Sequence, residues 1–150
     1  MKAHHIMKSQ VIKVKEEHNV RSVIEKFIEH GISGLPVVND SNEITGYISD
    51  GDIMRYIGSQ KQYLMNAYYI VNIAKGDDQF EDRTKSILNL NVMELAKKTI
   101  YKVNWDESVE HVAYILGKKQ IKKLPVERNG RLVGVISRGD VIRNSFKKLL

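Results

Sequence analysis

The 150-residue sequence contains no cysteine, only two prolines and no long apolar run. Without cysteine it cannot form a disulfide framework, a cysteine-ligated zinc site or a thiol nucleophile, which agrees with a reducing compartment. No stretch is long and apolar enough for a membrane span, and the first residues lack the apolar run of a secretory signal peptide. We therefore expect a cytoplasmic protein that makes no membrane contact.

Signatures of catalysis are also missing. The five histidines show no metal-ligand spacing with one another or with a carboxylate: His4, His5, His18, His30 and His111. No nucleophile is paired with a base, and neither a Gly-x-Gly-x-x-Gly motif nor a P-loop occurs. We expect neither a metal site nor an enzyme, so a nucleotide bound here would be sensed and not hydrolysed.

Acidic residues are scarce in the second part of the chain. Residues 92–150 contain 13 Lys and Arg against 6 Asp and Glu, whereas residues 1–91 contain 11 against 12. A basic face can bind nucleic acid, bind a small ligand that bears phosphate, or simply be solvated. A nucleic-acid binder is therefore an alternative, but one that charge alone does not favour.

The sequence does contain a duplicated motif. Residues 46–55, Gly-Tyr-Ile-Ser-Asp-Gly-Asp-Ile-Met-Arg, return at residues 134–143 as Gly-Val-Ile-Ser-Arg-Gly-Asp-Val-Ile-Arg. The two prolines, Pro36 and Pro125, occupy one repeated position, each within a Leu-Pro-Val segment. The predicted division is a first copy, an insertion and a second copy: residues 1–58, 59–91 and 92–150.

Hydrophobic periodicity predicts the same order of elements in both copies. In the first copy we expect a strand, a helix, two strands and a helix at residues 11–14, 20–28, 35–38, 44–48 and 49–58. The second copy repeats this order at residues 100–103, 109–116, 124–126, 132–136 and from Ser137 onward. Helical spacing also occurs in the insertion, over residues 63–74 and 80–88. The predicted fold class is α+β, with two β-α-β-β-α repeats and a helical insertion between them.

The duplicated motif places a serine and an aspartate at the start of a helix in each copy. Ser49 with Asp52, and Ser137 with Asp140, have the spacing of a helix N-cap and its third residue. This arrangement satisfies free backbone N–H groups and needs no ligand. The same carboxylates could instead accept the hydroxyl groups of a ribose, while serine oxygens, backbone N–H groups and an arginine meet a phosphate.

Charged neighbours of the motif leave further alternatives open. Arg55 and Arg143 follow the aspartates by three residues, so each could pair with its aspartate along the helix or contact a phosphate. Arg138 replaces the Asp50 of the first copy, which predicts that anionic charge is better tolerated at the second motif. The same half carries four further lysines near this motif: Lys118, Lys119, Lys122 and Lys123.

These residues resemble a pair of CBS domains, named after cystathionine beta-synthase and also called a Bateman module. The resemblance rests on the two Leu-Pro-Val segments and the two Gly-x-Ile-Ser-x-x-Asp motifs, and covers residues 6–57 and 90–145. It implies a regulatory module whose halves pack sheet to sheet about a pseudo-twofold axis. In such modules two clefts commonly bind AMP, ADP, ATP or S-adenosylmethionine. It further implies a homodimer and an unidentified regulated protein as partners.

The resemblance also implies a set of ligand-binding residues, with Asp52 and Asp140 on the ribose and the backbone of the Leu-Pro segments along the adenine. The first-copy residues of this set are Gly34, Leu35, Pro36, Ser49, Asp52 and Arg55. Those of the second copy are Lys123, Leu124, Pro125, Ser137, Arg138, Asp140 and Arg143. Two alternatives stay open: a fold used only for assembly, with the motifs as helix caps, and a basic nucleic-acid binder.

Overall fold

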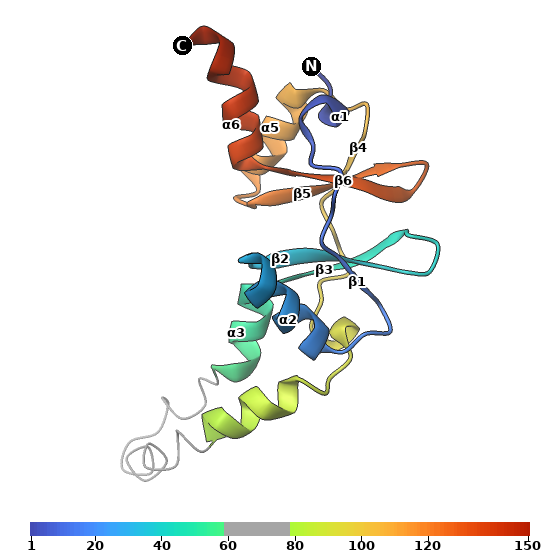
Figure 1. The fold of residues 1–150 in the computed structure, drawn as a ribbon, viewed down its shortest axis with the longest axis vertical. Coiled ribbons are helices and arrows are strands. Elements are labelled where there is room, and N and C mark those ends of the chain that lie inside the picture. Colours follow the sequence, from blue (N-terminus) through green and yellow to red (C-terminus); the bar gives the residue numbers. More distant parts are fainter. Residues whose placement is uncertain (59–78) are drawn as a thin grey trace.

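The computed structural model describes residues 1–58 and 79–150. Two three-stranded sheets face each other at its centre, and the main helices of each repeat cover the outer side of its sheet (Figure 1). The first repeat comprises β1 (Val14–Lys15), α2 (Val20–His30), β2 (Gly34–Val38), β3 (Ile44–Ser49) and α3 (Asp50–Ile57). The second comprises β4 (Val103–Asn104), α5 (Val109–Lys118), β5 (Lys123–Arg128), β6 (Arg131–Ser137) and α6 (Arg138–Phe146). The predicted α+β class and the β-α-β-β-α order of both copies are confirmed.

Local sequence signals begin and end the helices. At the starts of α2 and α5, the side chains of Asn19 and Ser108 accept hydrogen bonds of 3.3 and 3.1 Å from backbone N–H groups three residues on. Gly31 ends α2 in the left-handed conformation, with a φ of 60°. Gln120, just after α5, has a φ of 54°. The second copy therefore keeps the turn although it lacks the glycine.

Each sheet has its longer strands in an antiparallel pair and its first strand parallel to the middle one. Leu35 of β2 is paired with Ile48 of β3, and Leu124 of β5 with Ile136 of β6. All four side chains are at most 1% exposed and lie between the sheet and its helices. Because side chains alternate along a strand, the neighbours of Ile48 face the other sheet.

The first strand of each repeat starts later than the sequence predicts. Strands were expected at residues 11–14 and 100–103, but only the two residues of β1 and of β4 pair with the next strand. The reason lies just upstream, where Lys8 pairs with β6 and Lys97 pairs with β3, each in the other repeat. The chain must cross from one sheet to the other before β1 or β4 can form. The predicted starts of these two strands are therefore wrong.

Residues 2–8, the N-terminal strap, cross to the second repeat and complete its core. They contain α1 (Ala3–Ile6), in which Ala3 and Ile6 are 0% and 5% exposed and belong to the buried cluster of β5, β6 and α5. Lys8 exchanges two backbone hydrogen bonds with β6, of 2.9 and 3.0 Å. The second repeat thus buries its core with residues that precede the first repeat.

Residues 91–97, the linker strap, complete the core of the first repeat in the same way. They contain η2 (Val92–Glu94), and Val92 is 0% exposed within the cluster of β1, β2, β3 and α2. Lys97 exchanges two backbone hydrogen bonds of 2.9 Å with Tyr47 of β3. The two straps are related as the two repeats are, so each repeat depends on a segment from the other side of the pseudo-twofold axis.

The described part of the insertion packs on the first repeat. Residues 79–87 are helical, as predicted for residues 80–88, and Ile87 is buried in the first-repeat core. The Arg83 side chain donates a hydrogen bond of 2.9 Å to the Ile57 carbonyl at the end of α3. The helix predicted at residues 63–74 lies outside the described residues. Within the described ranges, no helix combines the length and the apolar character needed to cross a membrane.

The repeats also meet at their hairpin turns. The side-chain amide of Asn42, between β2 and β3, donates a hydrogen bond of 2.9 Å to the Leu132 carbonyl. The backbone carbonyl of Asn42 accepts a hydrogen bond of 2.9 Å from the Leu132 N–H. Asn129 and Gly130 form the two-residue turn between β5 and β6, with φ values of 53° and 78°, as the Asn-Gly pair predicts. Together with the straps, these contacts hold the two sheets in one arrangement.

Candidate functional site

A cleft of about 300 Å³ opens between the two repeats, beside the first copy of the duplicated motif. Four segments form it: the start of β2, the end of β3 with the start of α3, the crossing that begins at the linker strap, and the turn before β5. The lining residues are Ser33, Gly34, Tyr47, Ser49, Asp50, Lys97, Thr99, Ile100, Tyr101, Gln120, Ile121, Lys122 and Lys123. A ligand in this cleft would touch both repeats.

The apolar part of the cleft consists of Ile100, Tyr101 and Ile121. Tyr101 is 48% exposed, and the ammonium group of Lys119 lies 5.3 Å from the centroid of its ring. This distance is that of a cation–π contact, which limits the positions of the ring. Apolar and aromatic side chains with a few polar groups beside them are the usual lining of a small-molecule site.

Tyr47 narrows the cleft from the side of β3. Its neighbours Gly46 and Ile48 are buried, and the alternation of the strand turns Tyr47 toward the cleft. A Cβ atom at Gly34 would lie 2.6 Å from the Tyr47 hydroxyl oxygen, so the phenol lies over Gly34 and requires a glycine there. Burial, with a smaller contribution from Asp50, raises the pKa of Tyr47 to about 12. The phenol therefore stays a neutral hydrogen-bond donor at physiological pH.

Charged side chains in the cleft come from both repeats. Lys97 belongs to the linker strap, Lys122 and Lys123 precede or begin β5, and Asp50 begins α3. The sequence predicts that Lys122 and Lys123 act at the second motif, because they belong to the same half as Arg138. The structure places both in the cleft beside the first motif. The net charge of one half of the chain therefore does not give the charge of a cleft that both halves line.

At the start of α3, the first motif forms a closed set of polar contacts. The Ser49 N–H and hydroxyl groups donate to Asp52 Oδ2 at 2.9 and 3.3 Å, and Arg55 donates to Asp52 Oδ1. Asp52 is 5% exposed. The helix-start role and the Arg–Asp ion pair are therefore both present. Asp52 Oδ2 already accepts two hydrogen bonds, whereas Oδ1 accepts only that of Arg55, so a ribose hydroxyl could add to these contacts at Oδ1.

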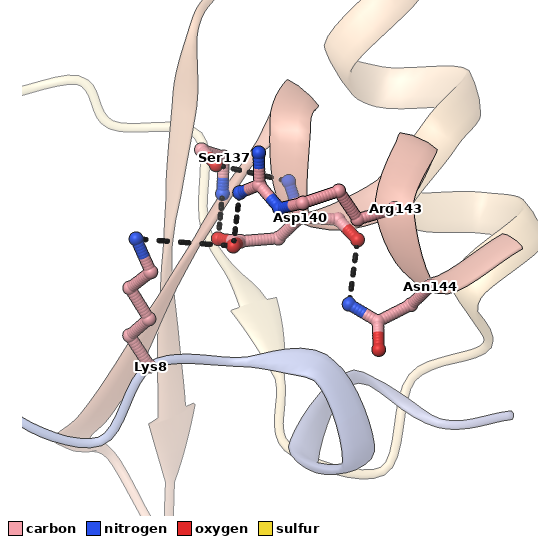
Figure 2. Close-up of polar contacts among 5 residues, drawn as sticks. All are labelled: Lys8, Ser137, Asp140, Arg143 and Asn144. Carbon is pink, nitrogen blue, oxygen red and sulfur yellow. Dashed lines mark hydrogen bonds and ion pairs between the residues drawn. The ribbon is translucent and has the colours of Figure 1, made fainter. Parts of the chain in front are cut away.

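At the start of α6, the second motif has the same contacts from the serine N–H and from the arginine to the aspartate, but its serine hydroxyl accepts a hydrogen bond (Figure 2). The Ser137 N–H donates to Asp140 Oδ2 at 2.9 Å, the Asp140 N–H donates to Ser137 Oγ at 3.1 Å, and Arg143 Nη2 donates to Asp140 Oδ1 at 3.0 Å. Lys8 Nζ, from the N-terminal strap, lies 4.0 Å from the same Oδ1, and Asn144 donates to the Asp140 carbonyl at 2.7 Å. Burial acts to raise the pKa of Asp140, but the hydrogen bonds from Ser137 and Arg143, with the charge of Lys8, outweigh it and lower that pKa.

The structure divides the predicted ligand-binding residues into three groups. Those that line the cleft are Gly34, Ser49 and Lys123. Those that are buried strand residues, outside the lining of the cleft, are Leu35, Pro36, Leu124 and Pro125. Those that lie in α3 and α6 or cap them are Asp52, Ser137, Arg138 and Asp140 at the helix starts, and Arg55 and Arg143 in the last turns.

Most other lining residues were missed from the sequence. Lys97 and residues 99–101 were missed because part of this segment was assigned to a strand, and Gln120 and Ile121 because they belong to the other repeat. Tyr47 could have been found, since it stands inside the duplicated motif at the position where the second copy has Val135. A tyrosine in one copy and a valine in the other indicate that the two sites differ in shape.

Comparison with known proteins agrees with this architecture. The CBS domain family model matches residues 3–59 and 92–147. An uncharacterised protein of Methanocaldococcus jannaschii is 28% identical over 146 residues, which cover 91% of this chain and 86% of that protein. The structure of Arabidopsis thaliana CBSX2 in complex with AMP has a TM-score of 0.74 at 21% identity and covers 99% of this chain and 98% of that one. The CBS domain pair of protein MJ0100, in complex with 5′-methylthioadenosine and S-adenosyl-L-methionine, gives 0.71 at 20% identity, with 99% and 98% covered.

These matches follow the two repeats. The two family matches contain the two β-α-β-β-α units and leave most of the insertion between them unmatched. The structural matches span both repeats at once, so the arrangement of the pair is shared as well as the single unit. The resemblance seen in the sequence is confirmed, and the chain belongs to the CBS domain family as a tandem pair.

Proposed function

We propose that the chain is a cytoplasmic regulatory module that binds an adenosine-containing ligand between its two CBS repeats. The observation that carries this proposal is the cleft beside Ser49 and Asp50, which is lined by both repeats. Its volume of about 300 Å³ lies at the lower end of the range for small-molecule sites. The ligand class is supported by two CBS pairs of the same fold, one bound to AMP and one to 5′-methylthioadenosine and S-adenosyl-L-methionine.

The parts of an adenosine ligand match the parts of this cleft. An adenine ring fits the apolar side chains of Ile100, Tyr101 and Ile121. A ribose would lie near the start of α3, beside Ser49 and Asp50, where the largely buried Asp52 would offer a charged acceptor to its hydroxyl groups. Phosphate groups would meet the ammonium groups of the lysines and the hydroxyl group of Ser49.

A ligand held in this way would act on the arrangement of the two repeats. Since the lining comes from both sheets, binding stabilises whichever arrangement brings the two walls to the ligand. The surface that the pair offers to a regulated protein would change with it, and by linkage that protein would change the affinity for the ligand. The module is therefore proposed to bind and signal, with no chemical step.

Thermal unfolding with a panel of ligands tests the proposal. At about one hundred times its dissociation constant, a bound ligand stabilises the folded state by about 2.7 kcal/mol. For a chain of this size we expect AMP, ADP, ATP or S-adenosylmethionine to raise the melting temperature by about 5–10 °C. GTP and CTP at equal concentrations are the matched controls and should give much smaller shifts.

The same measurement separates the proposal from its alternatives. A module used only for assembly would show no shift with any adenosine ligand at millimolar concentration, and that result would contradict the proposal. A gel-shift titration at several salt concentrations tests the nucleic-acid alternative, since binding to phosphate backbones weakens steeply with salt. We expect no shift of a nucleic-acid band at physiological salt.

We also propose that two copies of the chain associate through their helices. Five large apolar side chains on these helices are between 50% and 79% exposed: Ile28, Met54, Tyr114, Ile142 and Phe146. Light scattering should give about twice the chain mass of 17.2 kDa. The double substitution Ile142→Glu with Phe146→Glu should shift the mass to that of a monomer, whereas Lys148→Glu, an equally exposed change nearby, should not. A monomer at all concentrations of the unmodified protein would contradict the proposal.

A further inference from the structure

We infer that the cleft between the repeats selects adenosine ligands that carry a polyphosphate chain, and disfavours the cationic ligand S-adenosylmethionine. This inference rests on the proposed function, because it concerns the same cleft. It goes further in naming the charge of the ligand and the residues that set it. The residues that carry it are Lys97, Lys122 and Lys123, with Tyr47 beside them.

The three lysines are brought to one cleft by the fold, since Lys97 lies far from the other two in the sequence. Lys97 comes from the linker strap, which is held to β3 by backbone hydrogen bonds, and Lys122 and Lys123 come from the start of β5 in the other repeat. Among residues 1–58 and 79–150, none of the three forms an ion pair with a carboxylate. Like charges in one cleft repel each other, and an anionic ligand would relieve that repulsion.

Asp50 is the opposing charge, and its position limits its effect. It is the one acidic side chain among the lining residues, against three lysines. Its Oδ1 atom accepts a hydrogen bond of 2.8 Å from the Gly51 N–H, so the carboxylate is turned toward the N-terminus of its own helix, α3. A carboxylate is stabilised there by the helix itself. The cleft as a whole therefore keeps a positive excess.

Neutral donors add to the preference for phosphate oxygens. Ser33 and Thr99, each with a hydroxyl group, line the same cleft, and Tyr47 is a protonated phenol over Gly34. Ammonium and hydroxyl groups together donate to phosphate oxygens, whereas a sulfonium ion offers them no acceptor and adds a like charge. The chemistry of the lining thus favours an anion over a cation at equal size.

The two repeats supply these groups unequally. Sequence alignment of the repeats places Lys122 and Lys123 where the first copy has Ser33 and Gly34. Tyr47 lies over Gly34, while the second copy combines the smaller Val135 with the longer Lys123. The cleft beside the first motif therefore contains the phenol of one repeat and the lysines of the other. A symmetric pair of sites would not have this combination.

Calorimetric titration of the full chain with adenosine, AMP, ADP, ATP and S-adenosylmethionine tests the inference. We expect affinity to rise along the series from adenosine to ATP by at least about tenfold, because each added phosphate brings negative charge to the lysines. The affinity for ATP should fall as salt is raised, because salt screens the attraction between the lysines and the phosphates. S-adenosylmethionine should bind more weakly than ATP by a similar factor. Tripolyphosphate alone should bind more weakly than ATP, since it lacks the adenosine part.

A charge-neutralising double variant assigns the effect to the cleft. Lys122→Gln with Lys123→Gln should weaken ATP binding by about tenfold and change adenosine binding by less than about twofold. The matched control is Lys147→Gln with Lys148→Gln, two adjacent lysines in η3 (Lys147–Leu149), which removes the same charge away from the cleft. This control should leave the ratio of ATP to adenosine affinity unchanged.

The outcomes separate the inference from the proposed function. If adenosine or S-adenosylmethionine binds as tightly as ATP, and the Lys122→Gln and Lys123→Gln substitutions leave ATP affinity unchanged, the inference is overturned while the proposed function stands. If tripolyphosphate binds as tightly as ATP, adenosine is not recognised, and this result would overturn both. Absence of binding for every adenosine ligand would overturn the proposed function first, and the inference with it.

Discussion

Replacing Ile6 by alanine should destabilise the second repeat, although Ile6 lies before the first repeat in the sequence. Ile6 is 5% exposed and is buried among residues of α5, β5 and β6. Truncation of a buried isoleucine to alanine costs about 2–5 kcal/mol, because transfer free energy is lost and a cavity remains. For a chain of this length the melting temperature should fall by roughly 5–15 °C.

The region that Ile6→Ala destabilises is as informative as the size of the decrease in stability. In native-state hydrogen exchange, Ile6→Ala should lower the protection of β5 and β6 more than that of β2 and β3. Val92→Ala is the mirror experiment, since Val92 is buried in the first repeat but precedes the second. It should lower the protection of β2 and β3 instead.

A matched control removes an aliphatic side chain of the same size from an exposed position outside the proposed association surface. Leu149 in η3 is 76% exposed, so Leu149→Ala should change the free energy of unfolding by less than about 0.5 kcal/mol. If Ile6→Ala changed the free energy of unfolding as little, or if it lowered the protection of the first repeat instead, the N-terminal strap would not pack on the second repeat as the structure shows.

The fold was largely predictable because its signals are local. The helical spacing of Val20, Val23 and Phe27, the cap at Asn19 and the glycine at Gly31 each act within a few residues of chain. Because the motif is duplicated, the elements predicted for the first repeat could be assigned to the second as well. The straps were not predictable in this way, because nothing in a short apolar segment such as α1 indicates which of two similar cores it enters.

The cleft was harder to predict than the helix starts for a related reason. Ser49, Asp52, Ser137 and Asp140 could be placed from spacing alone, and the structure finds all four at helix starts. Lys97 and the residues of the turn before β5 reach the same cleft only through the crossing of the straps and the pairing of the two sheets. A site built between repeats follows from their packing, which residue spacing does not contain.

Replacing Asp52 should separate its role at the helix start from its proposed role as a ribose ligand. Loss of a helix-start partner costs about 1 kcal/mol, so unliganded Asp52→Ala should melt about 2–4 °C below the unmodified protein. A saturating ligand contributes more, about 2.7 kcal/mol at one hundred times its dissociation constant. If Asp52 holds the ribose, Asp52→Ala should lose most of the ligand-induced rise of about 5–10 °C, which is the larger effect.

The substitution Asp52→Asn makes the separation sharper. Asparagine still accepts a hydrogen bond from the Ser49 N–H but loses the charge that strengthens contacts to the ribose and to Arg55. We expect an unliganded melting temperature close to normal and an affinity for the adenosine ligand that is weaker by about tenfold, measured by calorimetry. The same two substitutions at Asp140 show whether a ligand also binds at the second motif.

Asp40→Ala is the matched control, since it removes one carboxylate from an exposed turn where Asp40 pairs with Lys15 at 3.1 Å. It changes the net charge as Asp52→Ala does but touches no helix start, so it should leave both the melting temperature and the affinity nearly unchanged. Normal affinity in both Asp52 variants would remove Asp52 from the site. Because Arg55 pairs with the Asp52 carboxylate, a ribose that binds there must share or displace this partner. Arg55→Ala should then lower stability and strengthen the binding of the adenosine ligand, because it frees the carboxylate for the ribose hydroxyls, whereas a purely structural Asp52 would leave that affinity unchanged.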